Sequence, residues 1–178
     1  LPQMDAVLIG PGLGQSEGTL AVTRTVLEEA TCPVVVDADG INVIAAHKDI
    51  LRERHYPTIL TPHAGEFARL GGGDPVTFAK DTDCILLLKG HRTVITDGEK
   101  IYVNQTGNPG MAVGGSGDVL AGITVSYLAQ GLEPLEAVKT AIYIHSCTFT
   151  HKITNSNCST NYIRRRINVI HIQTRKFH

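Results

Sequence analysis

The chain has 178 residues, enough for one domain with a sizeable core, and its 42% hydrophobic and 19% charged residues are typical of a globular protein. Its net charge of −1 excludes a uniformly basic or acidic protein; no apolar run reaches the length of a membrane span, and residues 1–4 do not resemble a signal peptide. Four cysteines without a Cys-x-x-Cys pair or metal-ligand spacing indicate free thiols, so we expect a cytoplasmic protein.

The first half of the chain alternates apolar runs with helical patterns. Continuous apolar runs, typical of buried strands, lie at 6–9, 33–36 and 58–60. A helix is predicted over 17–30, with Ser16 as its N-cap and an inner face made by Leu20, Val26, Leu27 and Ala30. Shorter helices are predicted over 41–46 and 64–70, and the glycine-rich run 71–75 ends the second of these.

The second half begins with a strand and a hairpin and continues with two helices. Residues 85–88 form an apolar run, and the strands 93–95 and 100–103 flank the turn Asp97-Gly98. Helices are predicted over 118–130 and 134–145, the latter burying Leu135, Val138, Ala141 and Ile142. This alternation predicts an α/β fold with a mostly parallel central sheet and helices on both faces.

Polar and glycine-rich segments follow the predicted strands at their carboxyl ends. They are Gly10-Pro-Gly-Leu-Gly14, Asp37-Ala-Asp-Gly40, Thr61-Pro-His-Ala-Gly-Glu66 and Lys89-Gly-His-Arg-Thr93. Open α/β sheets bind their ligands outside the carboxyl ends of the strands. We therefore expect these segments to converge on one crevice.

A fifth segment, Gly107-Asn-Pro-Gly-Met-Ala-Val-Gly-Gly-Ser-Gly-Asp118, leads directly into a predicted helix. Its last glycines can turn backbone N–H groups toward an anion, and the helix start adds the positive end of the dipole, which predicts a phosphate site. Asp118 is placed to take a proton from a hydroxyl that is being phosphorylated. In the alternative interpretation, the glycines only form a tight turn and Asp118 only complements the helix dipole.

Taken in order, the five segments resemble the ADP- or ATP-dependent NAD(P)H-hydrate dehydratases of the ribokinase-like superfamily, over about residues 5–145. The resemblance implies a ribokinase-like fold and a metabolite-repair enzyme that acts on NADH or NADPH whose nicotinamide ring is hydrated. A nucleotide's terminal phosphate is transferred to the ring hydroxyl, and loss of phosphate restores the double bond. ADP or ATP is the implied phosphate donor, and Mg²⁺ is expected with it.

The resemblance also implies roles for single residues. Asp118 would contact the substrate and act as the base. The substrate site would further include Gly12, His63, Ala64, Gly65, Glu66, Phe67, Ala68 and Arg69. The nucleotide site would comprise Lys89, Gly90, His91, Arg92, Thr93, Asn108, Pro109, Gly110, Met111, Ala112, Val113, Gly114, Gly115, Ser116 and Gly117. No residue is assigned as a metal ligand.

Several of these residues also have a plainer interpretation. Lys89 could neutralise phosphate charge or extend from a strand end into solvent. Gly12 could form a tight turn between strand and helix, and His63 could be an exposed loop residue. Asp37 and Asp39 could order water around Mg²⁺, but an Asx-turn or capping role is favoured for them.

The chain also departs from the family pattern. We expect a partial domain that begins in the middle of the family's fold, shortens the helical interval over 71–83 and diverges after His145. Family members often form tetramers, so a homo-oligomer is expected, although missing ends could remove that interface. The His63-Ala-Gly-Glu66 form resembles the bacterial branch, which tends to use ADP. The alternatives are a ribokinase-like small-molecule kinase and a degenerate, non-catalytic nucleotide-binding fragment.

Charge is distributed unevenly along the chain. Residues 1–146 hold 10 Lys or Arg against 17 Asp or Glu, whereas 147–178 hold six Lys or Arg and no acidic residue. We therefore predict a domain over 1–146 and a basic tail over 147–178 that is unlike the family. The tail could be an arm for nucleic acid centred on Arg164-Arg165-Arg166, or an extension outside the fold. The lack of interleaved aromatic residues favours the extension, so nucleic acid is not expected as a partner.

Overall fold

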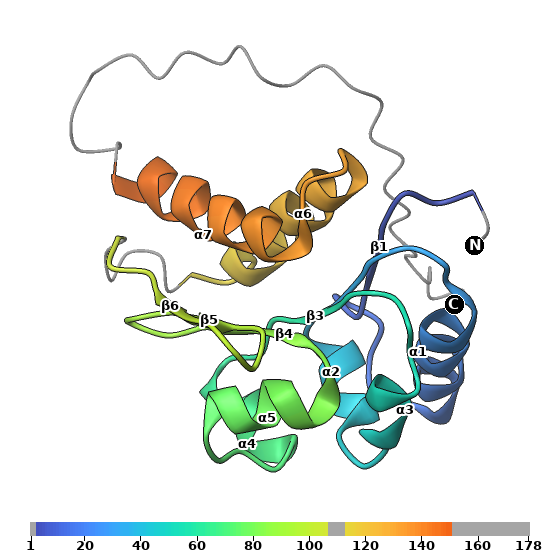
Figure 1. The fold of residues 1–178 in the computed structure, drawn as a ribbon. Coiled ribbons are helices and arrows are strands. Elements are labelled where there is room, and N and C mark those ends of the chain that lie inside the picture. The colour runs from blue at the N-terminus through green and yellow to red at the C-terminus, as the bar shows by residue number, and fades with distance from the viewer. Residues whose placement is uncertain (1–2, 107–112, 151–178) are drawn as a thin grey trace.

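A computed structural model describes residues 3–106 and 113–150, which fold around one six-stranded sheet (Figure 1). The strands follow each other in chain order across the sheet. Four are parallel, β1 (Val7–Ile9), β2 (Val34–Val36), β3 (Thr58–Leu60) and β4 (Ile85–Leu88), and two form an antiparallel hairpin, β5 (Val94–Thr96) and β6 (Ile101–Val103). Val7 pairs with Val34, and Val34 pairs with Thr58. The predicted strands and the mostly parallel α/β fold are therefore confirmed.

Helices cover both faces of the sheet (Figure 1). One face carries α1 (Glu17–Glu29), α2 (Asp39–Ile44), α3 (Asp49–Arg52), α4 (Ala64–Arg69) and α5 (Pro75–Thr82), and the other carries α6 (Ser116–Ala129) and α7 (Pro134–Thr150). Alternate strand residues face the two layers because side chains along a strand point to opposite faces. Val34, Val36, Leu60 and Leu86 join the first core, and Val35, Ile59, Ile85 and Leu87 the second.

Helix α1 shows how the sequence sets the local structure. Ser16 caps its start, as predicted, by accepting a hydrogen bond from the Thr19 N–H at 3.1 Å. Val26 and Leu27 are buried as expected, but Leu20 is only partly buried, because Thr19 and Thr23 face inward in its place. The hydroxyl of Thr19 bonds back to the loop before the helix, which makes this inward position favourable for a polar residue.

Two helices were not predicted. The structure forms α5 where the glycine run and Pro75 indicated a break, because Asp74 caps the helix by accepting from the Thr77 N–H at 2.8 Å. Proline is well tolerated in the first turn, where its missing N–H would have no partner. The short α3 was missed because a single turn carries too little periodicity to detect.

The two long helices differ from prediction mainly at their ends. Helix α6 begins at Ser116, two residues earlier than predicted, because Gly115 takes the cap position with a φ of +82°. Helix α7 buries the predicted apolar face but continues to Thr150, across the position where the predicted basic tail begins. The division into a domain over 1–146 and a tail over 147–178 stays a prediction.

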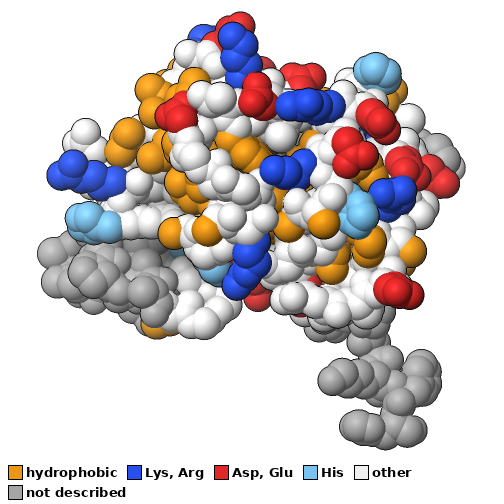
Figure 2. All heavy atoms as spheres, turned by 90° about the horizontal axis from the view of Figure 1, so that it is seen from below, with side chains coloured by type: hydrophobic (Ala, Val, Ile, Leu, Met, Phe, Trp, Pro, Cys, Tyr) orange, Lys and Arg blue, Asp and Glu red, His pale blue; other side chains and the backbone are white. Residues whose placement is uncertain are grey.

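The surface over α4 and α5 carries basic and acidic side chains intermixed, with hydrophobic side chains between them (Figure 2). Within residues 3–106 and 113–150, no helix combines the length and apolar character that a membrane span requires.

Candidate functional site

The segments that follow β1 to β4 are tied together at the carboxyl edge of the sheet. Asp39 accepts a hydrogen bond from the Gly14 N–H at 2.8 Å, which joins the segments after β1 and β2. The Lys89 N–H donates to the Pro62 carbonyl at 2.7 Å, and His63 pairs with Lys89 in an isolated parallel bridge. The segments therefore lie together at this edge, as expected, and the predicted crevice stays a prediction.

A buried ion pair crosses this edge. The Lys89 ammonium lies 2.7 Å from Asp37 Oδ1, with the lysine side chain 21% exposed and the aspartate side chain 1% exposed. Within the described residues, the second oxygen, Asp37 Oδ2, is buried without a hydrogen-bond partner. Neither interpretation of Lys89 anticipated this pair. Its direct contact with a phosphate stays a prediction.

The first turn of α6 lies against the ion pair. A Cβ built on Gly117 would lie 3.2 Å from Lys89 Nζ and 4.0 Å from Asp37 Oδ2. The Ser116 N–H donates to the Val113 carbonyl at 3.2 Å, whereas the N–H groups of Gly117 and Asp118 meet no acceptor within the described residues. Within the part of the chain that the structure describes, two first-turn amides thus lie without an acceptor beside the Lys89 ammonium, and this arrangement favours an anion.

Asp118 occupies the predicted place in the first turn of α6 and is exposed. Its carboxylate makes no hydrogen bond or ion pair within the described part of the chain. Gly114 and Gly115 are also exposed and face open space, since a Cβ on either would meet nothing within 4 Å. A carboxylate in this position, beside the first-turn amides, can accept a proton from a bound hydroxyl.

His63 caps helix α4 instead of being a plain loop residue. Its Nδ1 accepts from the N–H groups of Gly65 at 2.9 Å and Glu66 at 3.2 Å, and Glu66 Oε2 accepts from the His63 N–H at 2.8 Å. This reciprocal pattern is a capping box, with histidine in the place of serine or threonine. Because Nδ1 is an acceptor, the ring proton belongs on Nε2, and the side chain is 55% exposed.

The rest of the predicted substrate segment divides between surface and core. Ala64, Gly65 and Ala68 are exposed, and Arg69 donates to Asn42 Oδ1 at 2.7 Å. The ring of Phe67 is buried in the core, edge-on to Phe78 with centroids 5.2 Å apart. Phe67 therefore supports the helix from inside. Gly12 is exposed with a φ of +71°, a conformation that suits a tight turn.

The predicted nucleotide segment after β4 forms a closed turn. The Thr93 hydroxyl donates to the Gly90 carbonyl at 3.2 Å, and His91 and Arg92, which lie between these two residues, are exposed. Val113 is exposed as well. The remaining predicted nucleotide residues lie outside the described residues, namely Asn108, Pro109, Gly110, Met111 and Ala112.

Three positions that shape this edge were not singled out from the sequence. Gly10 has a φ of +123°, and a Cβ on it would lie 1.8 Å from the Asp37 carbonyl oxygen, while a Cβ on Gly40 would lie 3.1 Å from the Gly10 Cα. Ala38 has a φ of +48° and a ψ of −119°, a rare conformation for a residue with a side chain. The run Gly10-Pro-Gly12 indicates an unusual backbone conformation at Gly10, but nothing in the sequence indicates one at Ala38.

The aspartates of the segment after β2 are already engaged. Asp39 accepts from Gly14 and from Gln15 Nε2 at 3.3 Å, and Asp37 is paired with Lys89. No group of three or more His, Cys, Asp or Glu residues that could hold a metal occurs within residues 3–106 and 113–150. These residues do not fit a protein-ligated Mg²⁺ ion, which wants several free oxygen ligands.

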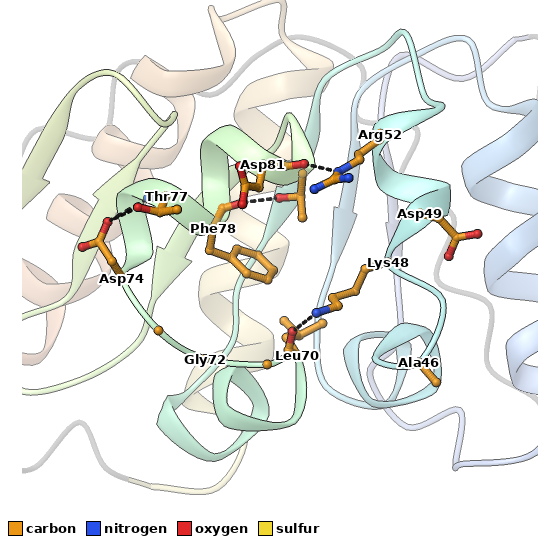
Figure 3. A pocket seen from close by; sticks show the side chains of 13 residues that line it. Ala46, Lys48, Asp49, Arg52, Leu70, Gly72, Asp74, Thr77, Phe78 and Asp81 are labelled. Carbon is orange, nitrogen blue, oxygen red and sulfur yellow. Dashed lines mark hydrogen bonds between the residues drawn. The ribbon is translucent and has the colours of Figure 1, made fainter.

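A hollow of about 500 Å³ lies elsewhere, between α3 and α5, and none of the candidate site residues lines it (Figure 3). Its two cations serve helix ends: Lys48 Nζ donates to the Leu70 carbonyl at 2.7 Å, and Arg52 donates to the Asp81 carbonyl. Both contacts satisfy carbonyls near helix carboxyl ends. The hollow is therefore a structural junction, and the site lies at the sheet edge.

The sheet order, the helices on both faces and the glycine segment at the start of α6 define a ribokinase-like α/β protein. A family model described as NAD(P)H-hydrate dehydratase matches residues 1–167, so the chain belongs to the NAD(P)H-hydrate dehydratase family. The match extends beyond residue 146, where the basic tail was predicted to begin.

Relatives and solved structures agree with this assignment. The chain is 42% identical over 158 residues to the bifunctional NAD(P)H-hydrate repair enzyme Nnr of Moorella thermoacetica, covering 82% of this chain and 30% of that protein. It is 37% identical to the ADP-dependent (S)-NAD(P)H-hydrate dehydratase of Listeria monocytogenes, covering 82% of this chain and 55% of that protein. The chain thus spans less than two thirds of either relative.

Among solved structures, the chain is similar to the ADP/ATP-dependent NAD(P)H-hydrate dehydratase of Bacillus subtilis, co-crystallised with ATP and Mg²⁺ and soaked with CoA. The TM-score is 0.72 at 33% identity, covering 88% of this chain and 61% of that one. The predicted family and fold are therefore confirmed.

Proposed function

We propose that the chain carries out the nucleotide-dependent dehydration of hydrated NADH or NADPH at the first turn of α6. The observation that carries the proposal is the juxtaposition of an exposed Asp118 with two amides of that turn that meet no acceptor within the described residues, next to the Lys89 and Asp37 ion pair. An anion held by those amides lies within reach of a carboxylate that can act as a base. Membership of the NAD(P)H-hydrate dehydratase family supports hydrated NADH or NADPH as the substrate.

In the proposed reaction, Asp118 takes the proton of the ring hydroxyl as the hydroxyl oxygen bonds to the terminal phosphorus of the nucleotide. The bond from that phosphorus to the bridging oxygen breaks, so ATP leaves as ADP, or ADP as AMP. The ring C–O bond then breaks with its electron pair on the phosphate, and the neighbouring carbon loses a proton to water to form the double bond. The amides of Gly117 and Asp118 stabilise charge on the transferred group.

We propose ADP or ATP as the donor, in keeping with the ADP-dependent relative and with the relative co-crystallised with ATP and Mg²⁺. Because Asp37 and Asp39 are engaged, Mg²⁺ would arrive on the nucleotide phosphates and keep most of its water ligands. The Lys89 side chain and the turn over residues 90–93 would contact the nucleotide. Gly12 and the exposed side chain of His63, whose Nε2 lies 3.5 Å from Glu66 Oε1, would contact the hydrate.

The test is an assay of the purified chain with hydrated NADH, Mg²⁺ and either ADP or ATP, following the return of dihydronicotinamide absorbance. Asp118→Asn is expected to lower the rate about 100-fold or more while leaving nucleotide affinity within a few-fold. Glu136→Gln, an exposed change on α7, is the matched control.

Other outcomes identify other functions. Accumulation of a stable phosphorylated product would identify a small-molecule kinase. A thermal shift with nucleotide but no turnover would identify a non-catalytic nucleotide binder. No shift with ADP, ATP or AMP would overturn the proposal.

A further inference from the structure

Helix α7 carries two consecutive buried polar residues, His145 at 4% and Ser146 at 0% exposure. Both lie on the side of the helix that otherwise buries Leu135, Val138, Ala141 and Ile142. Apolar residues would continue this packing at lower cost, since a buried polar group must be matched by a partner. The partners therefore indicate what the two residues do.

His145 reaches the start of α6. Its Nε2 lies 3.2 Å from the hydroxyl of Ser116, the first residue of that helix. Ser116 is 9% exposed, and its own N–H donates to the Val113 carbonyl, which fixes the turn before the helix. The contact thus holds the exit of the glycine segment, directly before Gly117 and Asp118.

Ser146 reaches the other end of the same segment. Its hydroxyl lies within hydrogen-bond distance of the Thr106 hydroxyl and 3.4 Å from Asn104 Nδ2. Thr106 and Asn104 also bond to each other, and the Asn104 N–H donates to the Thr93 carbonyl at 2.9 Å. These residues follow β6, where the chain leaves the sheet and enters the glycine segment.

We infer that His145 and Ser146 are positioning residues, which hold both ends of the segment between Thr106 and Ser116 on one rigid helix. We call this pair of residues and their contacts the clamp. The inference rests on the proposed function, because the clamp is taken to position the first-turn amides of α6 that would hold the phosphate. Two neighbouring residues of one helix lie at a fixed distance from each other. Because each holds one end of the segment, the distance between the two ends is fixed as well. A ligand then need not order the ends of the segment, which favours binding through preorganisation.

The first test uses nucleotide affinity, measured by titration calorimetry with ATP and Mg²⁺. Ser116→Ala and His145→Leu are each expected to raise the Kd about fivefold, since each removes the same hydrogen bond. The double variant should bind the nucleotide no more weakly than either single variant, because both changes remove one and the same contact and their effects are therefore coupled. His145→Gln, which can still place an amide near the serine, should restore the Kd to within about twofold of the original chain. Glu136→Gln is the control on the same helix.

The second test needs no ligand. Hydrogen exchange of the peptide over residues 113–120 should become faster in Ser116→Ala and stay unchanged in Ser146→Ala. Exchange over residues 101–106 should become faster in Ser146→Ala and stay unchanged in Ser116→Ala. A peptide over β2 should not change in either variant. Faster exchange throughout the chain would mean a general loss of stability and would overturn the inference, as would additive Kd changes or unchanged exchange. If the original chain binds no nucleotide, the proposed function fails and the exchange result still decides on the clamp.

Discussion

Replacing Lys89 by methionine tests the electrostatic centre of the site. The change keeps most of the aliphatic stem and removes the ammonium that lies 2.7 Å from Asp37 Oδ1. Asp37 is 1% exposed, so its carboxylate would remain in the protein without a counter-charge. Removing one partner of a buried pair costs about 3–5 kcal/mol. Because the Lys89 side chain is 21% exposed, water can reach part of the vacated space, and the lower end of that range is expected.

The free energy of unfolding is measured by urea denaturation of Lys89→Met and of the double variant Asp37→Asn/Lys89→Met. A loss of about 3 kcal/mol corresponds to a Tm lower by about 6–12 °C for a chain of this size. The double variant should recover most of the loss, because it leaves no charge buried. The reasoning is refuted if the single variant loses less than about 1 kcal/mol, or if the double variant is less stable than the single one. Nucleotide affinity of the recovered double variant then isolates the contribution of Lys89 to phosphate binding.

Three further predictions concern stability. Gly10→Ala should cost more than about 3 kcal/mol in urea denaturation, since it adds a backbone clash to a positive φ, whereas Gly14→Ala, whose Cβ meets nothing within 4 Å, should cost about 1–2 kcal/mol. Arg54→Met should cost about 3–5 kcal/mol, because the buried guanidinium donates to three carbonyls at the end of α1, while the exposed Arg52→Met should cost less than half of that. Burial lowers the pKa of His145 from its ordinary value of 6.5, although a hydrogen bond to the Ser116 backbone opposes the shift. The unfolded chain therefore binds a proton first as pH falls, so the free energy of unfolding should decrease below about pH 6.5, and less steeply in His145→Gln.

The sequence predicted the fold well because its strands are continuous apolar runs that only a doubly covered sheet can bury. It predicted α6 and α7 because long amphipathic helices repeat their pattern several times. It failed at α5, where Pro75 was interpreted as a breaker. The same residue starts a helix when an aspartate precedes it to cap the first turn.

The site was predicted less completely because its geometry depends on partners far apart in the sequence. Lys89 and Asp37 are 52 residues apart, and nothing local to either residue indicates that they meet. His63 was predicted to be a substrate residue, with an exposed loop residue as the alternative, and neither interpretation included its cap. Histidine is not among the preferred N-caps, yet its Nδ1 can accept the same bonds as a serine hydroxyl. The only sequence signal for the clamp was that two polar residues, His145 and Ser146, continue an apolar helical face. Their role becomes clear only once their partners are known.

The backbone of Ala38 explains how one short segment serves two neighbours. A φ of +48° and a ψ of −119° turn the chain sharply between Asp37 and Asp39. As a result, Asp37 reaches Lys89 beneath the first turn of α6, and Asp39 reaches the Gly14 N–H after β1. We expect that an ordinary backbone conformation here would break at least one of these contacts, so that the two contacts together offset the cost of about 1–3 kcal/mol for the observed conformation. Strain of this kind persists only where surrounding contacts hold the backbone in place. We therefore infer that the segment after β2 aligns the loops of the site.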